Sequence, residues 1–391
     1  MKKAKWVVAL LVVALAAGLA VTLFACGGGT EGTEATESTA PESTATTIDE
    51  GLDYELVLSV GMPAVASLFV TYLDPWAKAV EASSNGRVKI EIYDNNSLVK
   101  EEQQIEACRS GTSDMTAFQP TWEAGVFPVC ELASQPMIFP STEVADRVMW
   151  DLIGEFGQEE LKDFHLLGIM MISPAQYGGK VEVRVPDDME GMRIRSGGAE
   201  ETEAIKALGA TPVEIATSDI PIQIERNAFD GAFMSWGFHV WMTNEWATNW
   251  AETNSFYRPI YLVMSKEKWD SLPAAVQEAF DANSGIEASV AYNLQDEAYQ
   301  LDNTAVPAAQ QKGWDRLHVA LRAEEVGSEI IQLTPEEREL WLQALAPVLQ
   351  TWATRYASKV PTDEILVRLD ELVAQYYSAP EAAETTETSA P

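Results

Sequence analysis

Residues 186–231 read PDDMEGMRIRSGGAEETEAIKALGATPVEIATSDIPIQIERNAFDG, and this stretch decides the fold. It predicts a strand at Gly191–Arg195, a helical run that ends at Gly209, a second strand around Val213 and a second helix that closes on Asp230-Gly231. An arginine at the end of a strand is a permanently charged fork that matches a carboxylate. The first strand is therefore the candidate binding element.

The strand carries two arginines, Arg193 and Arg195, which point to opposite faces because they are two residues apart. Arg195 is nearer the strand end and precedes Ser196-Gly197-Gly198. We predict that Arg195 faces a cleft and holds the anion of a small molecule, and that Arg193 pairs with an acidic side chain. The alternative for Arg195 is a structural ion pair of the same kind.

Length and charge limit the class of protein. A chain of 391 residues is long enough for two domains. The formal net charge of -34 argues against a nucleic-acid partner, because phosphate would be repelled. The three histidines lie far apart, so no metal site is expected, and no cofactor is predicted. Cys108 and Cys130 are expected to be buried and free.

The N-terminus has the pattern of an export signal. Three lysines precede an apolar stretch that ends at Ala25, and Cys26 follows directly. This resembles a bacterial lipobox, which predicts a signal peptide over residues 1–25 and lipidation of Cys26. The alternative is an uncleaved anchor, since the stretch approaches the ~20 residues that span a bilayer. Both place the body outside the cytoplasm, tethered to the outer face of the membrane.

The segments on either side of the body are predicted to be flexible. Residues 26–52 form an acidic linker without aromatic residues, and residues 379–391 have a similar composition. The body is predicted to form a first domain from residues 53–171 and 258–302, and a second from residues 172–257 and 303–378.

Strand and helix alternate in the first half of the body. Strands are predicted at Tyr54–Gly61, Arg87–Tyr93 and Asp114–Phe118, with helices between them. This alternation indicates a largely parallel sheet covered by helices. The loops after the first and third strands should open on the cleft. Trp122, in the second of these loops, is either a ligand wall or an anchor packed on the rim.

Later segments give further expectations. Val181–Val185 and Trp314–Val319 are predicted strands, and Ile286–Leu301 is predicted to be the long helix that spans both domains. Thr334 with Glu337 predicts a helix N-terminus through a capping box. The apolar stripe of that helix, which should pack on the body, is Leu340, Trp341, Leu345 and Val348.

An ordered set of motifs resembles one family. The set comprises Gly191–Arg195, Ala207–Val213 and Asp230-Gly231, with Gly86–Glu91 and Gly111–Met115 further upstream. It is similar to the solute-binding proteins of tripartite ATP-independent periplasmic (TRAP) transporters, of the dicarboxylate-binding type, over about residues 54–357.

The resemblance implies a fold and a function. The expected fold is α/β, with two α/β domains, a ligand cleft between them as in periplasmic binding proteins, and a link of crossing strands and a long helix. The expected function is capture of an organic acid, held bidentately by Arg195, and its delivery to a TRAP permease in the membrane. The protein is expected to act as a monomer. Ligand contacts in the family also map near Met62, Gln119 and Thr217.

The chain departs from the family pattern at two places. Many relatives have a second base where this chain has Ala175-Gln176, so Gln176 or Tyr177 is the expected substitute. Many relatives also have Glu-Asn-Pro after the Asp-Gly pair, where this chain continues from Ala232 to Trp236. Met234 and Trp236 are therefore predicted to line the cleft. An apolar pocket with one arginine suits a monocarboxylate with an apolar or aromatic body.

Aromatic residues recur at short intervals from Trp236 to Trp250, and this spacing is typical of the buried face of a helix. Trp236 is predicted to reach the cleft, with Phe238 and Trp241 as alternatives, and His239 is predicted to be structural.

Two other functions compete with transport. No nucleophile elbow, phosphate loop or histidine-based triad is present, so catalysis is not expected. A sensory protein that presents its ligand to a receptor stays open, because it needs only the same closing cleft.

Overall fold

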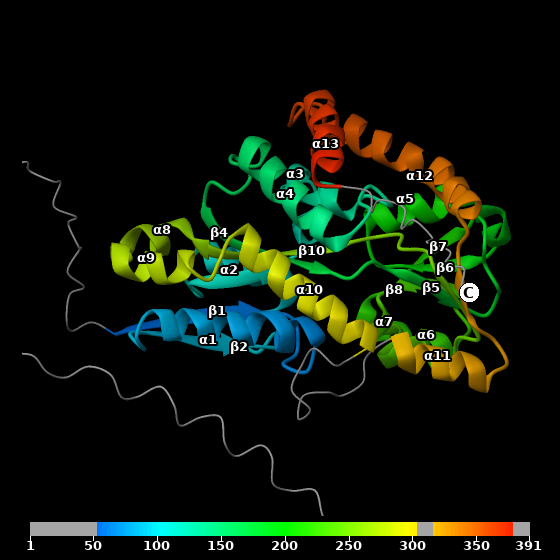
Figure 1. The fold of residues 1–391 in the computed structure, drawn as a ribbon, viewed down its shortest axis with the longest axis horizontal. Coiled ribbons are helices and arrows are strands. Elements are labelled where there is room, and N and C mark those ends of the chain that lie inside the picture. The colour runs from blue at the N-terminus through cyan, green and yellow to red at the C-terminus, as the bar shows by residue number, and fades with distance from the viewer. Residues whose placement is uncertain (1–52, 303–315, 378–391) are drawn as a thin grey trace, which may run out of the picture. The chain divides into compact units, whose positions relative to one another are not determined.

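The computed structural model describes residues 53–302 and 316–377. The predicted signal peptide, Cys26, the linker and the tail lie outside these ranges. Within them the strands form two sheets, with the orders β2-β1-β3-β10-β4 and β11-β9-β5-β8-β6-β7 (Figure 1). Neither order follows the sequence, and β10 lies between β3 and β4 because it returns to the first sheet after the chain has built most of the second.

The first sheet, called the five-stranded sheet below, comprises β1 (Tyr54–Val60), β2 (Val88–Tyr93), β3 (Met115–Phe118), β4 (Phe164–Ile172) and β10 (Arg258–Ser265). The second, called the six-stranded sheet, comprises β5 (Gln176–Gly179), β6 (Arg193–Ser196), β7 (Thr211–Glu214), β8 (Gly231–Met234), β9 (Asn249–Glu252) and β11 (Ile330–Gln332). Both sheets are mixed.

The parallel pairs are β1 with β2 and β3, β6 with β7 and β8, and β9 with β11. The largely parallel sheet expected from the sequence is wrong for the region around β10, which runs antiparallel to both β3 and β4. The reason is topological, since the chain re-enters the sheet from the opposite end.

The helices of the first half are α1 (Asp74–Ser83), α2 (Gln104–Arg109), α3 (Pro128–Glu131), α4 (Thr142–Phe156), α5 (Ala199–Ala207), α6 (Ile220–Glu225) and α7 (Trp236–Phe238). Those that follow are α8 (Lys266–Ser271), α9 (Ala274–Asp281), α10 (Ile286–Asp302), α11 (Arg316–Glu325), α12 (Pro335–Tyr356) and α13 (Thr362–Tyr376). The predicted end of the first helix is confirmed, because Asn85 and Gly86 adopt φ angles of 56° and 76°.

Two predicted strands are wrong. Val185 and the residue before it donate their backbone N–H groups to the carboxylate of Asp188 at 3.0 and 2.8 Å, and so have no strand partner there. The second predicted strand overlaps α11, whose Val319 and Ala323 are buried one helical turn apart. In both places a short alternation of apolar residues fits a helix or a turn as well as a strand.

Two segments cross between the sheets. One leads from β4 to β5, and the other leads from β9 to β10. They hold each other, because Ala175 N donates to Phe256 O at 2.8 Å and Ser255 N donates to Ala175 O at 2.9 Å. The crossing strands implied by the resemblance are therefore present, and they place the start of β10 between the sheets.

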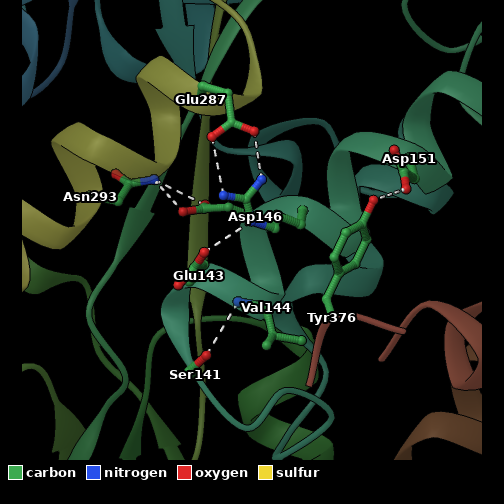
Figure 2. Close-up of polar contacts among 9 residues, drawn as sticks. Ser141, Glu143, Val144, Asp146, Asp151, Glu287, Asn293 and Tyr376 are labelled. Carbon is green, nitrogen blue, oxygen red and sulfur yellow. Dashed lines mark hydrogen bonds and ion pairs between the residues drawn. The ribbon is translucent and has the colours of Figure 1, made fainter. Parts of the chain in front are cut away.

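Helix α10 covers the exposed edge of β4. Ser289 Oγ accepts from Ile169 N at 3.0 Å, and Asn293 Oδ1 accepts from Met171 N at 3.1 Å. The Asn293 amide also donates to both carboxylate oxygens of Asp146 on α4 at 3.0 Å (Figure 2). These polar side chains satisfy backbone groups that an edge strand leaves open.

The same helix extends to α7 and α11, which belong with the six-stranded sheet (Figure 1). The prediction of a helix that spans both domains is thus confirmed for α10.

Helix α12 also joins the two cores. Its capping box is as predicted, with Glu337 N donating to Thr334 Oγ1 at 3.2 Å and the Glu337 carboxylate accepting from Thr334 N at 2.8 Å. Trp341 packs in the core of the six-stranded sheet, and Trp352 packs in the core of the five-stranded sheet. Leu340 is 47% exposed, so its place in the predicted stripe is wrong. The N-terminal half of α12 therefore packs on the core of the six-stranded sheet, and its C-terminal end packs on the core of the five-stranded sheet.

Candidate functional site

A cavity of about 610 Å³ is lined by residues from both sheets. Gln119 follows β3, Arg195 and Met234 lie near the ends of β6 and β8, and Thr217 follows β7. These are carboxyl ends of strands, where open α/β sheets bind ligands. The charged residues of the lining are Arg195, Arg258, Arg355, Lys359, Glu101, Glu131 and Glu200.

A second cavity of about 400 Å³ adjoins the first. The two share six lining residues, which are Glu101, Gln119, Trp122, Ile172, Thr217 and Phe238. Most of the rest of its wall is apolar and includes Met62, Leu68, Met242 and Ile260. The site therefore combines a charged compartment with an apolar one.

Arg195 is buried, with 4% of its surface exposed, and its donors are only partly used. Nε donates to Ile215 O at 3.0 Å, and Nη2 donates to Thr217 Oγ1 at 3.2 Å. Within the described part of the chain, Nη1 donates no hydrogen bond. Its nearest ionic partner is the carboxylate of Glu201, 3.8 Å away. Burial lowers the pKa of Arg195 from its ordinary value, although a guanidinium keeps its charge in proteins.

The absence of a side chain at Gly197 leaves room for Nη1 of Arg195. A Cβ at Gly197 would lie 2.5 Å from Arg195 Nη1, so no other residue fits here without a shift. The Gly197 N–H donates to Glu201 Oε2 at 2.8 Å. The same oxygen accepts from Arg258 Nη2 at 2.8 Å. Glu201 thus joins the strand end of β6 to the start of β10.

The structure brings together six of the nine ligand-binding residues predicted from the sequence. The six that line the adjoining cavities are Arg195, Gln119, Trp122, Met62, Thr217 and Met234. Trp122, left open as wall or anchor, lines both cavities. Phe238, named as an alternative, also lines both, whereas the side chain of Trp241 is outside the described part.

The other three predicted residues lie elsewhere. The Gln176 amide donates to Asn254 Oδ1 at 2.6 Å and to Pro174 O at 3.0 Å, and its oxygen accepts from Asn254 N at 3.0 Å. The Tyr177 hydroxyl donates to Val181 O at 2.9 Å. Trp236 is buried in a core cluster with Trp250. None of the three lines either cavity, because each is engaged in packing or in the protein's own hydrogen bonds.

His239 is buried as a structural residue, as the sequence suggested. Its Nδ1 lies 2.7 Å from Thr243 Oγ1, and its Nε2 lies 3.0 Å from Gln176 O. Burial lowers the pKa of His239 to about 4. The imidazole is therefore neutral at pH 7, and its two ring nitrogens already have partners.

Arg258 is the residue that the sequence reasoning missed. It begins β10, pairs in register with Ile172 and lines the charged cavity. The sequence did indicate Arg258, because a single arginine directly precedes the apolar residues Pro259–Met264. The resemblance directed the search for a second base to Ala175-Gln176, whereas the base that lines the cavity, Arg258, follows the second crossing segment.

Four of the remaining charged residues of the cavity, Glu131, Glu200, Arg355 and Lys359, have partners within the protein. Tyr356 donates to Glu131 at 2.5 Å, Arg355 Nη1 donates to Glu200 at 3.2 Å, and Lys359 Nζ donates to Gly125 O at 2.6 Å. Burial raises the pKa of Glu131 from its ordinary value. Burial also raises the pKa of Glu101.

The described residues contain no cluster of three or more histidine, cysteine, aspartate or glutamate side chains that could hold a metal ion. No helix among them has both the length and the apolar composition needed to cross a bilayer. Cys108 and Cys130 are both buried and free.

Several known proteins are similar to this chain. It is 27% identical over 293 residues to the C4-dicarboxylate-binding periplasmic protein DctP of Rhodobacter capsulatus, covering 71% of this chain and 80% of that protein. A TRAP solute-binding protein of Rhodoferax ferrireducens, solved with copurified benzoate, superposes with a TM-score of 0.70 at 20% identity and covers 82% of this chain and 98% of that one.

A marine metagenome TRAP protein, solved with 3-hydroxybenzoate, gives a TM-score of 0.71 at 21% identity, over 83% of this chain and 99% of that one. These structures confirm the predicted two-domain α/β fold. These two proteins and the Rhodobacter protein are solute-binding proteins, not enzymes. The model of one family matches residues 62–355, about three quarters of the sequence. The chain belongs to that family, the bacterial extracellular solute-binding proteins of family 7.

Proposed function

We propose that this protein captures a small organic acid, a monocarboxylate with an apolar or aromatic body, and delivers it to a TRAP-type membrane permease. One observation supports the proposal most strongly. Arg195 is buried and lines the larger cavity, and its Nη1 donates no hydrogen bond to any described residue. A charged guanidinium with an open donor at a cavity wall binds a carboxylate favourably, because hydrogen bonds between ionised groups are stronger than those between neutral ones.

The apolar body is inferred from the adjoining cavity. Met62, Leu68, Phe238, Met242 and Ile260 offer it few hydrogen-bond partners. Each hydroxyl of a sugar acid that faced these apolar side chains would be buried without a hydrogen-bond partner, at a cost of about 1–3 kcal/mol. An aromatic or branched aliphatic body gains free energy in proportion to the apolar area it buries.

The relatives differ in the acids they bind, so they do not decide the ligand. The Rhodobacter protein is named for C4-dicarboxylates, and two of the solved structures hold benzoate or 3-hydroxybenzoate. The apolar wall of the second cavity favours the aromatic monocarboxylates for this chain.

The proposal includes an extracytoplasmic location and a membrane tether. The basic start, the apolar stretch and Cys26 support export followed by lipidation at Cys26. We also propose that residues 26–52 are the spacer between lipid and body, and that the protein works as a monomer with the domain boundaries predicted above. Mass spectrometry of the membrane fraction, comparing the protein with its Cys26→Ser variant, tests the tether. An unmodified Cys26 on the intact chain contradicts it.

A thermal-shift screen of organic acids tests the proposed ligand class, because a ligand that binds the folded state raises the melting temperature by mass action. The panel should contain benzoate, phenylacetate, branched-chain 2-oxo acids, C4-dicarboxylates, sugar acids and uncharged amides of the aromatic acids. We expect aromatic or branched monocarboxylates to give the largest shifts and their amides to give none. Stabilisation only by sugar acids, or equally by the amides, contradicts the proposal.

A further inference from the structure

We propose that Glu201 sets the charge selectivity of this site. As a built-in counter-ion to Arg195 and Arg258, it leaves the arginine subsite with one net positive charge, so that one carboxylate is accepted and a second is refused. The inference rests on the proposed function, because it assumes that a carboxylate binds at Arg195. It adds the residue that distinguishes a monocarboxylate from a dicarboxylate.

The geometry places one carboxylate between two guanidinium groups. Glu201 Oε2 lies 2.8 Å from Arg258 Nη2 and 3.8 Å from Arg195 Nη1. Both Glu201 and Arg195 are almost fully buried, so their charges are only weakly screened by solvent. The Gly197 N–H fixes the same oxygen at 2.8 Å. The acid is therefore held where it offsets one of the two positive charges.

The position of Glu201 also leaves the arginines available to a ligand. Its distance to Arg195 is an ion-pair distance and exceeds that of a hydrogen bond, so the Nη1 donors stay open. Glu201 Oε1 is buried and has no hydrogen-bond partner among the described residues. Glu201 lines neither of the two adjoining cavities, so it acts on a ligand through the field of its buried charge, which disfavours a second negative group near the arginines.

The other cations of the cavity do not provide a second carboxylate site. Arg355 donates to Glu200 at 3.2 Å, and Lys359 donates to the backbone oxygen of Gly125 at 2.6 Å. Glu101 and Glu131 line the same wall. A second carboxylate would displace an existing pair or approach an acid, and both outcomes cost free energy.

Replacing Glu201 with glutamine isolates its charge. Glu201→Gln keeps the size of the side chain and retains an oxygen that can accept from Gly197 N, while the arginine subsite gains a second net positive charge. Arg258→Gln changes the charge in the opposite direction. The double variant returns the subsite to one net positive charge. Glu203→Gln is the matched control, since Glu203 lies on the same helix α5, pairs with Lys206 at 3.0 Å and does not line the cavities.

The experiment measures the Kd values of benzoate and phthalate by titration calorimetry for the wild type and these four variants. The two probes differ by one adjacent carboxylate. We expect the ratio of the phthalate Kd to the benzoate Kd to fall at least about tenfold in Glu201→Gln, because one unit of local charge is removed near the second carboxylate. The ratio should rise in Arg258→Gln and return to within about threefold of the wild type in the double variant. It should be unchanged in Glu203→Gln.

The outcomes separate this inference from the proposed function. If the wild type binds benzoate and the ratio does not change in Glu201→Gln, the inference is overturned and the proposed function stands. If the wild type binds neither probe, the proposed aromatic ligand class and the inference both fail. Thermal melting of each variant without ligand checks the fold. If Glu201→Gln does not fold, Arg258→Gln still decides, since an unchanged ratio in that variant also overturns the inference.

Discussion

Arg195 near the end of β6 and Gln176 at the start of β5 are two buried polar residues that were both predicted from the sequence to bind the ligand. Arg195 on β6 has donors without acceptors among the described residues. Gln176 on β5 has its amide nitrogen and oxygen both bonded to Asn254. Both side chains are polar and similarly buried, but they differ in charge and in hydrogen-bond satisfaction. A buried polar group that the protein itself satisfies stabilises the fold, whereas one left half-satisfied is available to a ligand.

The surroundings of each residue explain this difference. Beyond Arg195 the chain continues as Gly197-Gly198, and the absence of a side chain at Gly197 leaves the guanidinium open. Gln176 instead follows a crossing segment, and the returning crossing brings Asn254 directly to its amide. The returning crossing segment therefore occupies the amide of Gln176, whereas it leaves the guanidinium of Arg195 available to a ligand.

Arg195→Ala should have the largest effect on binding. We expect a loss of about 2–5 kcal/mol in affinity for the best monocarboxylate of the screen, because the carboxylate loses its buried charged partner. Arg195→Lys should lose nearly as much, since an ammonium cannot reproduce the bidentate geometry. Titration calorimetry measures both, and wild-type affinity in either variant refutes the assignment.

His239, which contacts the backbone of β5 at Gln176 O, should make the free energy of unfolding depend on pH. Its folded pKa of about 4 lies below the ordinary 6.5, so the unfolded state binds more protons between these values. Its contribution is complete above about pH 6.5 and is lost as the pH falls toward 4. The expected loss is on the order of 3 kcal/mol.

Urea unfolding of the wild type and His239→Gln at pH 7 and pH 4.5 measures this contribution. The variant should lose less stability between the two pH values than the wild type. Glu160, whose pKa burial raises to about 7, contributes with the opposite sign but equally in both proteins. An identical pH dependence in the two proteins contradicts a neutral, buried His239.

Gln176→Ala should affect stability and not binding. Removing the amide leaves Asn254 and Pro174 O without their partners, which should cost about 1–3 kcal/mol in the free energy of unfolding. Affinity for the monocarboxylate should stay within about threefold of the wild type. A loss of tenfold or more in affinity would return Gln176 to the binding site and remove the contrast with Arg195.

Arg193→Ala should have the smallest effect. Its side chain is 47% exposed and pairs with Asp230 at 2.7 Å, and an exposed pair of this kind contributes about 0–1 kcal/mol. Chemical denaturation should show a change of that size, with ligand affinity unchanged. A large loss of binding would mean that the two arginines of β6 had been assigned to the wrong faces.

Local patterns predicted the parts of the structure that depend on neighbouring residues. The capping box at Thr334, the helix end at Asn85 and the opposite faces of Arg193 and Arg195 follow from spacing along the chain. The loops after β1 and β3 were predicted to open on the cleft, and Met62 and Gln119 of these loops line the cavities.

Tertiary contacts decided the parts that the sequence could not predict. Gln176 and Tyr177 are satisfied by Asn254 and by Val181 O, and Arg258 reaches the cavity because β10 returns between the sheets. The resemblance directed the search for a second base to the wrong crossing segment. Such pairings depend on which strands meet, and no spacing within one segment contains that information.

A crystal structure with the strongest monocarboxylate from the screen tests the central claim most directly. The account predicts a ligand carboxylate oxygen about 2.7–3.0 Å from Arg195 Nη1, and the ligand body against Phe238 and Met62. A ligand held elsewhere in the cavity, with Nη1 directed at Glu201 or at solvent, would contradict it.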